Sequence, residues 1–447
     1  MSIAIAIVIF SLLIFVHELG HFAAAKLLGV RVLEFSLFMG PRLFSVVRGE
    51  TRYSIKLVPI GGSCMMEGEE QSSDDGRALC KKPKWARAVI MAAGPFVNIL
   101  VAVLALAAAN FFSGYQDNVV SYVVPDSPAA VASTPLMAGD RVLRYAGRAV
   151  NVPVELDMYA QDTRGAEAQV AFRRGGALHV ATILPETIPE SYYIIGFTGA
   201  TAYGPDWNLA VAVEEGAPAY AAGMREGDRL LTVGGRSPGS REELRGILAD
   251  FADGQAMIEW ERPGAGLMSG AVEPRHVESY GGYETGMLFA SVDKPSLPAA
   301  LGHAYFDAVS YAKMVGFSLK WLVTGQAGLN QVSGPVGIVA EIGSVVSQDV
   351  NEGVPPEQAK SAREAFFIKL FYLLRFSSLI GVNLGLVNLI PFPALDGSKL
   401  LLIGVEAVRR KAMPPEREAL ISFVGLVALM VVMAFTFFND IGRLVAK

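Results

Sequence analysis

The stretch that decides the fold is Met1–Val16, which carries no charged residue and leads directly into His17-Glu18-Leu19-Gly20-His21. Two histidines four positions apart lie on one face of a helix, where their ring nitrogens can converge on a single metal ion. Glu18, beside the first histidine, is placed to act as a general base toward an attacking water molecule. Because ionisable groups are costly in hydrocarbon, this H-E-x-x-H motif in a membrane-length apolar segment indicates a functional site.

The composition also favours a membrane protein. The 447 residues are 52% hydrophobic and only 18% charged, which is more apolar than an ordinary soluble domain. About 20 apolar residues cross a bilayer, and the long apolar stretches predict four transmembrane helices, at 1–28, 88–113, 366–397 and 418–441. The first stretch is a weaker match to a signal peptide, because no basic residue precedes its apolar run.

Charge distribution predicts the orientation of these spans. Residues 26–87 contain eleven Lys or Arg against seven Asp or Glu, and residues 397–417 contain five against two. The long segment 114–365 instead has eighteen basic and thirty acidic residues. Short basic loops stay on the cytoplasmic side. We therefore expect 29–87 and the loop 398–417 inside, with both termini and the acidic region outside. The two cysteines then lie on the reducing side, where no disulfide is expected.

Alternating apolar residues between 30 and 62 predict a membrane-associated β-hairpin or small sheet after the first helix. An exposed strand edge near the metal helix is suited to pairing with an extended substrate segment. A small cytoplasmic cap with no substrate role is an equally good interpretation. The sequence alone leaves both open.

An internal repeat organises the outer region. Ser127-Pro128-Ala129 precedes Gly139-Asp140, and Ala217-Pro218-Ala219 precedes Gly227-Asp228. The pattern resembles tandem PDZ domains at 115–195 and 196–292. Such β-rich domains bind extended peptides by strand addition, although two rigid modules can also act only by restricting access. The following segment, 296–365, predicts amphipathic helices along the outer membrane face and a linker.

A catalytic zinc ion usually has three protein ligands, and Asp396 is the best third candidate. It ends the third span in Asn388-Leu389-Ile390-Pro391-Phe392-Pro393-Ala394-Leu395-Asp396-Gly397, at the same expected depth as the two histidines. The two prolines break the helix and let the carboxylate turn inward. With Glu50 or Glu67 as the third ligand, the protein would instead be a membrane zincin that works on cytosolic loops.

Two amides in the third span, Asn383 and Asn388, need partners in hydrocarbon. They either join helices or contact the substrate backbone and the oxyanion that forms on it. A spacing of five residues places them roughly 140° apart on an ideal helix, so they share a target only if the helix breaks between them, at Gly385. Asn98 in the second span is expected to serve packing.

Together these motifs resemble the site-2 proteases, of the bacterial regulator-of-sigma-E protease type. The resemblance covers nearly the whole chain, and its motifs are H-E-x-x-H at 17–21, Gly61-Gly62, Gly94-Pro95-x-x-Asn98, the PDZ pair, Ser333-Gly334-Pro335-Val336-Gly337, and Asn388-x-x-Pro391-x-Pro393-x-Leu395-Asp396-Gly397. It implies an intramembrane zinc metalloendopeptidase that cuts single-pass membrane proteins within or near their transmembrane segment. Anti-sigma factor-like substrates already shortened by another protease, and remnant signal peptides, are the implied substrate classes in regulated intramembrane proteolysis and stress response.

The resemblance also implies residue roles, one Zn²⁺ per chain and a bacterial inner (cytoplasmic) membrane location, with the lipid bilayer as a partner and no nucleic acid. Carried over by position, the zinc ligands are His17, His21 and Asp396, the general base is Glu18, and the substrate contacts are Asn383, Asn388, Pro391 and Pro393. The main rival from another class is a PDZ-bearing membrane scaffold or transporter with an inert metal site. Substituting Glu18 by Gln separates the two, because only a peptidase would lose its activity.

Overall fold

The computed structural model describes residues 2–69, 71–189, 191–199, 206–278, 281–326, 328, 334, 336–339, 362–411, 413 and 415–445. The chain forms two compact units, of which one comprises Met1–Tyr115 with Asp293–Lys447 and the other Gln116–Val292. Most of the expected linker before the third span, including its polar stretch 349–361, lies outside the described residues.

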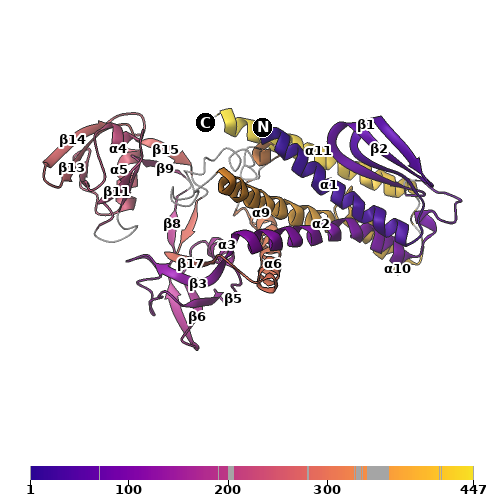
Figure 1. Cartoon of the computed structure of the whole chain (residues 1–447), viewed down its shortest axis with the longest axis horizontal. Helices are drawn as coiled ribbons and strands as arrows, with labels where there is room; N and C mark the ends of the chain where they lie inside the picture. The colour runs from indigo at the N-terminus through magenta and orange to yellow at the C-terminus, as the bar shows by residue number, and fades with distance from the viewer. Residues whose placement is uncertain are drawn as a thin grey trace. The chain divides into compact units, whose positions relative to one another are not determined.

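Four helices of the first unit are long and apolar enough to cross a membrane, as predicted. They are α1 (Ser2–Leu27), α2 (Lys84–Ser113), α9 (Ala362–Leu389) and α11 (Pro415–Val445). Helix α2 is central, because α1, α9 and α6 (Leu297–Val323) all pack against it (Figure 1). The helix α6 occupies the region expected to be amphipathic, and its Ala300, Ala304 and Ala308 are buried.

Glycines let the helices around α2 approach closely. A Cβ atom on Gly20 of α1 would lie 2.5 Å from the carbonyl oxygen of Ala93 in α2. On α9, a Cβ atom on Gly385 would lie 2.8 Å from the carbonyl oxygen of Pro95. Real Cβ atoms do not pack at such distances, so both crossings require glycine. The backbones of α1 and α9 therefore both reach α2 near its Gly94-Pro95 segment.

The predicted β-hairpin consists of β1 (Val32–Arg48) and β2 (Thr51–Met66), which pair antiparallel. Its register is more elaborate than a simple hairpin. Leu37 of β1 is paired with Gly62 on one side and with Ile55 on the other, whereas Arg42 is paired with Lys56. The chain thus forms four strand segments in the order 42–48, 51–56, 32–37 and 62–66. The segment 62–66 forms an edge, and β2 packs against α1.

Between the third and fourth spans the structure corrects two predicted boundaries. Helix α9 ends at Leu389, short of the expected 397, and a new helix, α10 (Asp396–Arg409), occupies most of the segment expected to be the loop 398–417. The physical reason is an amphipathic pattern: Ile403 and Glu406 are buried, and α10 packs against α2. The prediction of a loop was based on the basic residues of this segment and did not consider its helical periodicity.

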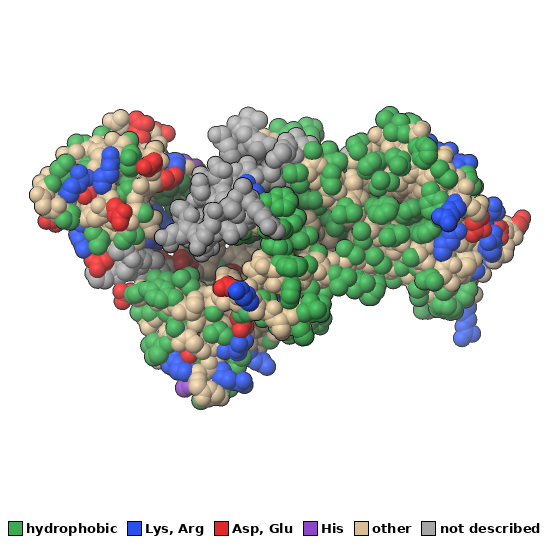
Figure 2. Space-filling view, viewed as in Figure 1, with side chains coloured by type: hydrophobic (Ala, Val, Ile, Leu, Met, Phe, Trp, Pro, Cys, Tyr) green, Lys and Arg blue, Asp and Glu red, His purple; other side chains and the backbone are tan. Residues whose placement is uncertain are grey.

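The face of the helical unit that is visible in Figure 2 is largely apolar. Hydrophobic side chains cover the helices, and Lys and Arg side chains gather near the end of this unit that carries the β1–β2 hairpin and α10. Helix α11 is the most exposed span, with 11% of its apolar window buried against 22–39% in the other three. Among its described residues, only Gly425, Thr436 and Asp440 are buried.

The second unit contains two β-rich modules. The first module has a sheet with the strand order β17 (Met287–Val292), β3 (Tyr115–Val123), β4 (Arg141–Tyr145), β6 (Ala168–Arg174) and β7 (Ala177–Ile183). The short strand β5 (Arg148–Ala149) also pairs with β4. The helix of this module is α3 (Val154–Asp162). The repeat spacing predicted that the first module ends near residue 195. It does not end there, because β17 joins its sheet. Its last strand comes from 287–292, beyond the second module.

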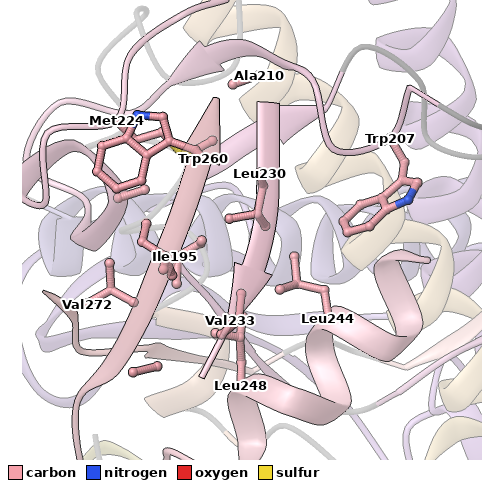
Figure 3. Packing of buried hydrophobic residues seen from close by; sticks show 13 residues of the cluster. Ile195, Trp207, Ala210, Met224, Leu230, Val233, Leu244, Leu248, Trp260 and Val272 are labelled. Carbon is pink, nitrogen blue, oxygen red and sulfur yellow. The ribbon is translucent and has the colours of Figure 1, made fainter. Parts of the chain in front are cut away.

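The second module is built on β12 (Arg229–Val233), β13 (Ala256–Arg262) and β14 (Gly266–Val272), with α4 (Pro218–Ala221) and α5 (Arg241–Ala249). Its core packs Trp260, Leu230 and Leu248 between sheet and helix (Figure 3). Strand β10 (Phe197–Gly199) pairs with β11 (Ala210–Val213). The module has its own buried core and is a distinct packing unit.

The connections of the second module run side by side. Strand β8 (Glu186–Ile188) pairs antiparallel with β16 (Gly282–Glu284), and β9 (Ser191–Ile194) pairs with β15 (Arg275–Glu278). The chain leaves the first module along one strand of this ladder and returns along the other. The second module is therefore an insertion within the first.

Candidate metal and catalytic site

Three ligand atoms from two distant parts of the chain converge at one point. The Nε2 atoms of His17 and His21 are 3.1 Å apart, and the Asp396 Oδ2 atom lies 3.0 Å from the first and 3.3 Å from the second. Both histidines are buried, with 7% and 6% of their surface exposed. Among the described residues this is the only group of three or more His, Cys, Asp or Glu side chains arranged to hold a metal.

The spacing of these atoms fits a tetrahedral zinc site. Ligand atoms about 2.0–2.1 Å from a zinc ion are separated by about 3.3 Å from one another in tetrahedral geometry, close to the three separations observed. Two imidazoles and one carboxylate are a donor set that catalytic zinc sites use, with a fourth position left for water or substrate. The residues present therefore fit the ion that the H-E-x-x-H motif predicts.

The orientation of the His21 ring is fixed by a hydrogen bond at Nδ1, the ring nitrogen that faces away from His17 and Asp396. Its Nδ1–H donates a 2.8 Å hydrogen bond to the carbonyl oxygen of Ile90 in α2. With its proton on Nδ1, the ring presents a free lone pair on Nε2, the atom that faces His17 and Asp396. Gly94, one turn further along α2, lies against the same ring. The α1–α2 crossing thus sets both the tautomer and the position of this imidazole.

The chain places Asp396 by a tight turn between α9 and α10. Ala394 has a positive φ of 78°, and Asp396 is the first residue of α10. A side chain on Gly397 would overlap the carbonyl oxygens of Leu389 and Ile390, so the turn requires glycine after the aspartate. The L-D-G motif combines a ligand with the residue that lets the chain fold back behind it.

Glu18 is half-buried and lies at a cleft of about 460 Å³. Residues 62–69 form most of its other wall. The backbone of Cys64 lies within hydrogen-bonding reach of the Glu18 carboxylate. Cys64 is not a rival nucleophile, because burial raises the pKa of its thiol far above the ordinary value and keeps it protonated. Glu18 therefore faces a cleft with space for water molecules.

The rival third ligands are engaged elsewhere. Glu50 forms ion pairs with Lys26 at 2.9 Å and with Arg77 at 2.7 Å. Glu67 accepts a 2.5 Å hydrogen bond from the Ser73 hydroxyl. Neither belongs to the group of converging metal-ligand atoms. The geometry favours Asp396 over both.

The predicted substrate contacts are less concentrated than the metal ligands. Asn383 lies within α9, and its Oδ1 atom is buried without a hydrogen-bond partner among the described residues. Asn388 is half-buried one residue before the end of the helix, Pro391 is exposed and Pro393 is half-buried in the following turn. Helix α9 runs unbroken through Gly385, so the condition under which the two asparagines could share one target is not met. Gly385 serves the close contact with α2 instead.

Two features of the site escaped sequence reasoning. Asn98, expected to serve packing, is 1% exposed and places its Nδ2 atom 3.4 Å from Nδ1 of His17. Lys399, one turn after Asp396, forms a 2.7 Å ion pair with Glu69, which lines the Glu18 cleft. The spacing Asp396 to Lys399 on one helix offered a signal for the second, but the segment was expected to be a loop.

The fold and this site define a class: a chain with several helices of membrane-crossing length, a His–His–Asp group arranged to hold a metal and a neighbouring glutamate, the arrangement of a membrane metallopeptidase. The model of peptidase family M50 matches residues 5–432, so the chain belongs to this site-2 protease family and is a zinc metallopeptidase. The predicted family and enzyme class are thereby confirmed.

Relatives match over nearly their full length. A Clostridium perfringens protein that carries the name zinc metalloprotease is 28% identical over 442 residues, covering 99% of this chain and 98% of that one. Zinc metalloprotease RasP of Shouchella clausii is 28% identical, with 98% of both chains covered. Regulator of sigma-W protease RasP of Bacillus subtilis is 26% identical, covering 98% of this chain and 97% of that one.

Proposed function

We propose that this enzyme cleaves single-pass membrane proteins within or near their transmembrane segment, in regulated intramembrane proteolysis. The observation that carries the proposal is the meeting of His17, His21 and Asp396, two of which lie inside an apolar helix of membrane-crossing length. The Bacillus subtilis relative is named as a regulator of a sigma factor. An anti-sigma factor-like protein, shortened beforehand by another protease, is accordingly the first substrate class to test, and remnant signal peptides are the second.

His17, His21 and Asp396 would hold one zinc ion, which when bound supplies Lewis acidity toward water and the scissile carbonyl. Glu18 accepts the proton of the attacking water and later delivers it to the leaving amine. Buried walls on the α1–α2 side exclude bulk solvent, and the cleft beside Glu18 admits the water that hydrolysis consumes.

A transmembrane helix hides its peptide groups in its own hydrogen bonds, so the substrate must unwind before attack. The edge segment 62–66 offers replacement partners. It pairs with residues 32–37 on one side only, and a Cβ atom on Gly62 would lie 3.5 Å from Cγ of Glu18. An unwound stretch added to this edge would run beside the catalytic glutamate. The unpaired Oδ1 atom of Asn383, together with Asn388, Pro391 and Pro393, is proposed to contact the substrate. The two asparagines would do so at different points, because α9 is unbroken between them.

The two modules of the second unit are proposed to be PDZ-like domains that select substrates by size. Both repeats place a buried aspartate at the start of a strand: Asp140 pairs with Arg174, and Asp228 with Arg262. The second module also has a groove of about 220 Å³ between residues 192–199 and α5, a place for an extended peptide. Prior trimming would remove a bulky outer domain that clashes with the modules.

The orientation follows the charge distribution. We propose an inner (cytoplasmic) membrane location with both termini and the second unit on the periplasmic side, and the metal site near the cytoplasmic side. The basic hairpin end and α10 would then face the cytoplasm. Cysteine labelling of Cys80 from the cytoplasmic side, and of cysteines introduced at exposed positions of the second unit from outside, tests this arrangement.

The deciding experiment compares wild type with Glu18→Gln, using purified full-length protein and a model single-span substrate. Zinc content should stay at about one ion per chain in both, while cleavage by Glu18→Gln should be lost. A Glu18→Gln variant that keeps its cleavage rate would overturn the role of Glu18 as general base. In cells, deleting 116–292 should allow untrimmed substrate to be cut; if it stays uncut, the size filter is wrong.

A further inference from the structure

Asn98 is a buried polar side chain beside His17 for which the mechanism has no role. It lies on α2 one turn after Gly94 and is 1% exposed. Its Nδ2 atom is 3.4 Å from Nδ1 of His17, and its Oδ1 atom is buried with no hydrogen-bond partner among the described residues. A buried amide oxygen without a partner destabilises the fold, so this orphaned acceptor calls for an explanation.

The amide of asparagine can be turned by 180° so that its oxygen and nitrogen exchange places. With Nδ2 toward His17, a hydrogen bond requires Nδ1 to be the acceptor, which puts the ring proton on Nε2. Nε2 is the atom that faces His21 and Asp396, and a protonated Nε2 cannot ligate a metal. With Oδ1 toward His17, the ring donates Nδ1–H, the orphaned oxygen gains its partner, and the lone pair of Nε2 is free.

We propose that Asn98 is a positioning residue whose Oδ1 accepts the Nδ1–H of His17 and thereby holds Nε2 of that histidine in its zinc-binding form. His21 provides the parallel within the same site, because its Nδ1–H is accepted by the Ile90 carbonyl. Ile90 and Asn98 are both on α2, so one helix fixes both imidazoles of the H-E-x-x-H motif. This proposal rests on the zinc-peptidase assignment and adds a residue to it.

The test measures zinc affinity of full-length protein by competition with a chelator, together with the visible absorption spectrum of the Co²⁺-substituted protein. Asn98→Leu removes the acceptor at similar volume, and its zinc affinity should fall about 10- to 100-fold, the usual effect of losing such an outer partner. Asn98→Asp keeps an oxygen acceptor, and its zinc affinity should stay closer to wild type than that of Asn98→Leu.

Asn110 supplies a matched control. It is also buried on α2, and its Nδ2 donates a 2.9 Å hydrogen bond to Asp307, away from the metal ligands. Asn110→Leu therefore removes a buried amide from the same helix and should leave zinc affinity and the Co²⁺ spectrum unchanged. Equal losses in Asn98→Leu and Asn110→Leu would mean a general packing effect and overturn the proposal.

Further outcomes are decisive as well. Unchanged zinc affinity and Co²⁺ spectrum in folded Asn98→Leu would overturn the proposal. If Asn98→Leu does not fold, Asn98→Asp decides alone: zinc affinity within tenfold of wild type supports the acceptor role, and a larger loss in folded protein overturns it. Glu18→Gln measured in parallel keeps the two proposals apart, because its zinc binding should remain intact even where the Asn98 variants lose theirs.

Discussion

Gly94 of α2 lies against the imidazole of His21, so closely that a methyl group on the glycine would overlap Nε2, the metal-facing atom. The same histidine is held from its other nitrogen by Ile90, one turn earlier on α2. One short segment of α2 thus acts as the template on which a ligand from another helix is set. The template requires both the absence of a side chain at one position and a carbonyl at the other.

We expect Gly94→Ala to displace His21 and to lower both zinc affinity and cleavage. A shift of about 1 Å in a catalytic constellation can cost about 100-fold in rate, and that is the loss predicted for kcat/KM. The matched control is Gly302→Ala on α6, where nothing lies within 4 Å of an added Cβ atom. Similar activity in the two variants would show that the His21 ring accommodates the methyl group.

Asp396→Asn should lower zinc affinity by on the order of 100-fold or more, because removing a direct ligand exceeds the 10- to 100-fold effect of an outer partner. Glu67→Gln should leave zinc content unchanged, since the Glu67 carboxylate accepts a hydrogen bond from the Ser73 hydroxyl and does not belong to the group of converging metal-ligand atoms. Zinc analysis of the dialysed proteins checks both. Zinc lost from Glu67→Gln and kept by Asp396→Asn would restore the rival ligand set.

The ion pair between Lys399 and Glu69 ties α10 to the wall of the Glu18 cleft. Because both side chains are partly exposed, a coupling energy of only about 1 kcal/mol is expected. A double-mutant cycle of thermal unfolding with Lys399→Met and Glu69→Gln measures it. Strictly additive single-variant effects would contradict the predicted coupling.

Asp228 of the second module should give a pH-dependent contribution to stability. Burial alone would raise the pKa of its carboxyl, but hydrogen bonds from Arg262 and the backbone N–H of Arg225 outweigh burial and lower it. A lowered pKa in the folded state means that the ionised form stabilises the fold above the unfolded pKa, about 3.9. This stabilisation is lost as the pH falls through the folded pKa.

Asp228→Asn should therefore destabilise the second module by about 3 kcal/mol at pH 7, the cost of breaking a buried pair. At low pH the difference should be smaller, because it shrinks as the pH falls from about 4 through the lowered folded pKa. Chemical denaturation of the full-length protein, followed by its intrinsic tryptophan fluorescence, to which the buried Trp207 and Trp260 of this module contribute, measures the difference at each pH. Asp250→Asn, which breaks an exposed pair with Arg236, is the control with little effect. A loss at Asp228 that is equal at both pH values would contradict the linkage.

The convergence of His17, His21 and Asp396 could be predicted from sequence because each residue has a local signature. His17 and His21 share one helix face at fixed spacing, and Asp396 follows a proline-broken apolar run, so their expected depths agree. The role of Asn98 had no such signature, because its partner lies on another helix and the contact depends on how α1 and α2 cross. Helix α10 was missed for a different reason: basic residues dominated an amphipathic segment.

The strand pairing of the second unit was also beyond sequence reasoning. Repeat spacing located the two modules, but it carries no information about which sheet a distant strand such as β17 completes. Likewise, alternation located the hairpin without revealing that residues 32–37 lie between two parts of β2. Pairing partners of this kind are set by three-dimensional packing, which a linear pattern does not record.

The antiparallel pair Ile188 and Gly282 closes the base of the inserted module. Paired strand residues have Cα atoms only about 5 Å apart, so a short turn could rejoin the chain there after excision of everything between them. The host sheet would keep each of its strands, including β17, and the helical unit would keep its covalent order. The inserted module is therefore replaceable by a different fold without any change to the host sheet or to the helical unit that carries His17, His21 and Asp396.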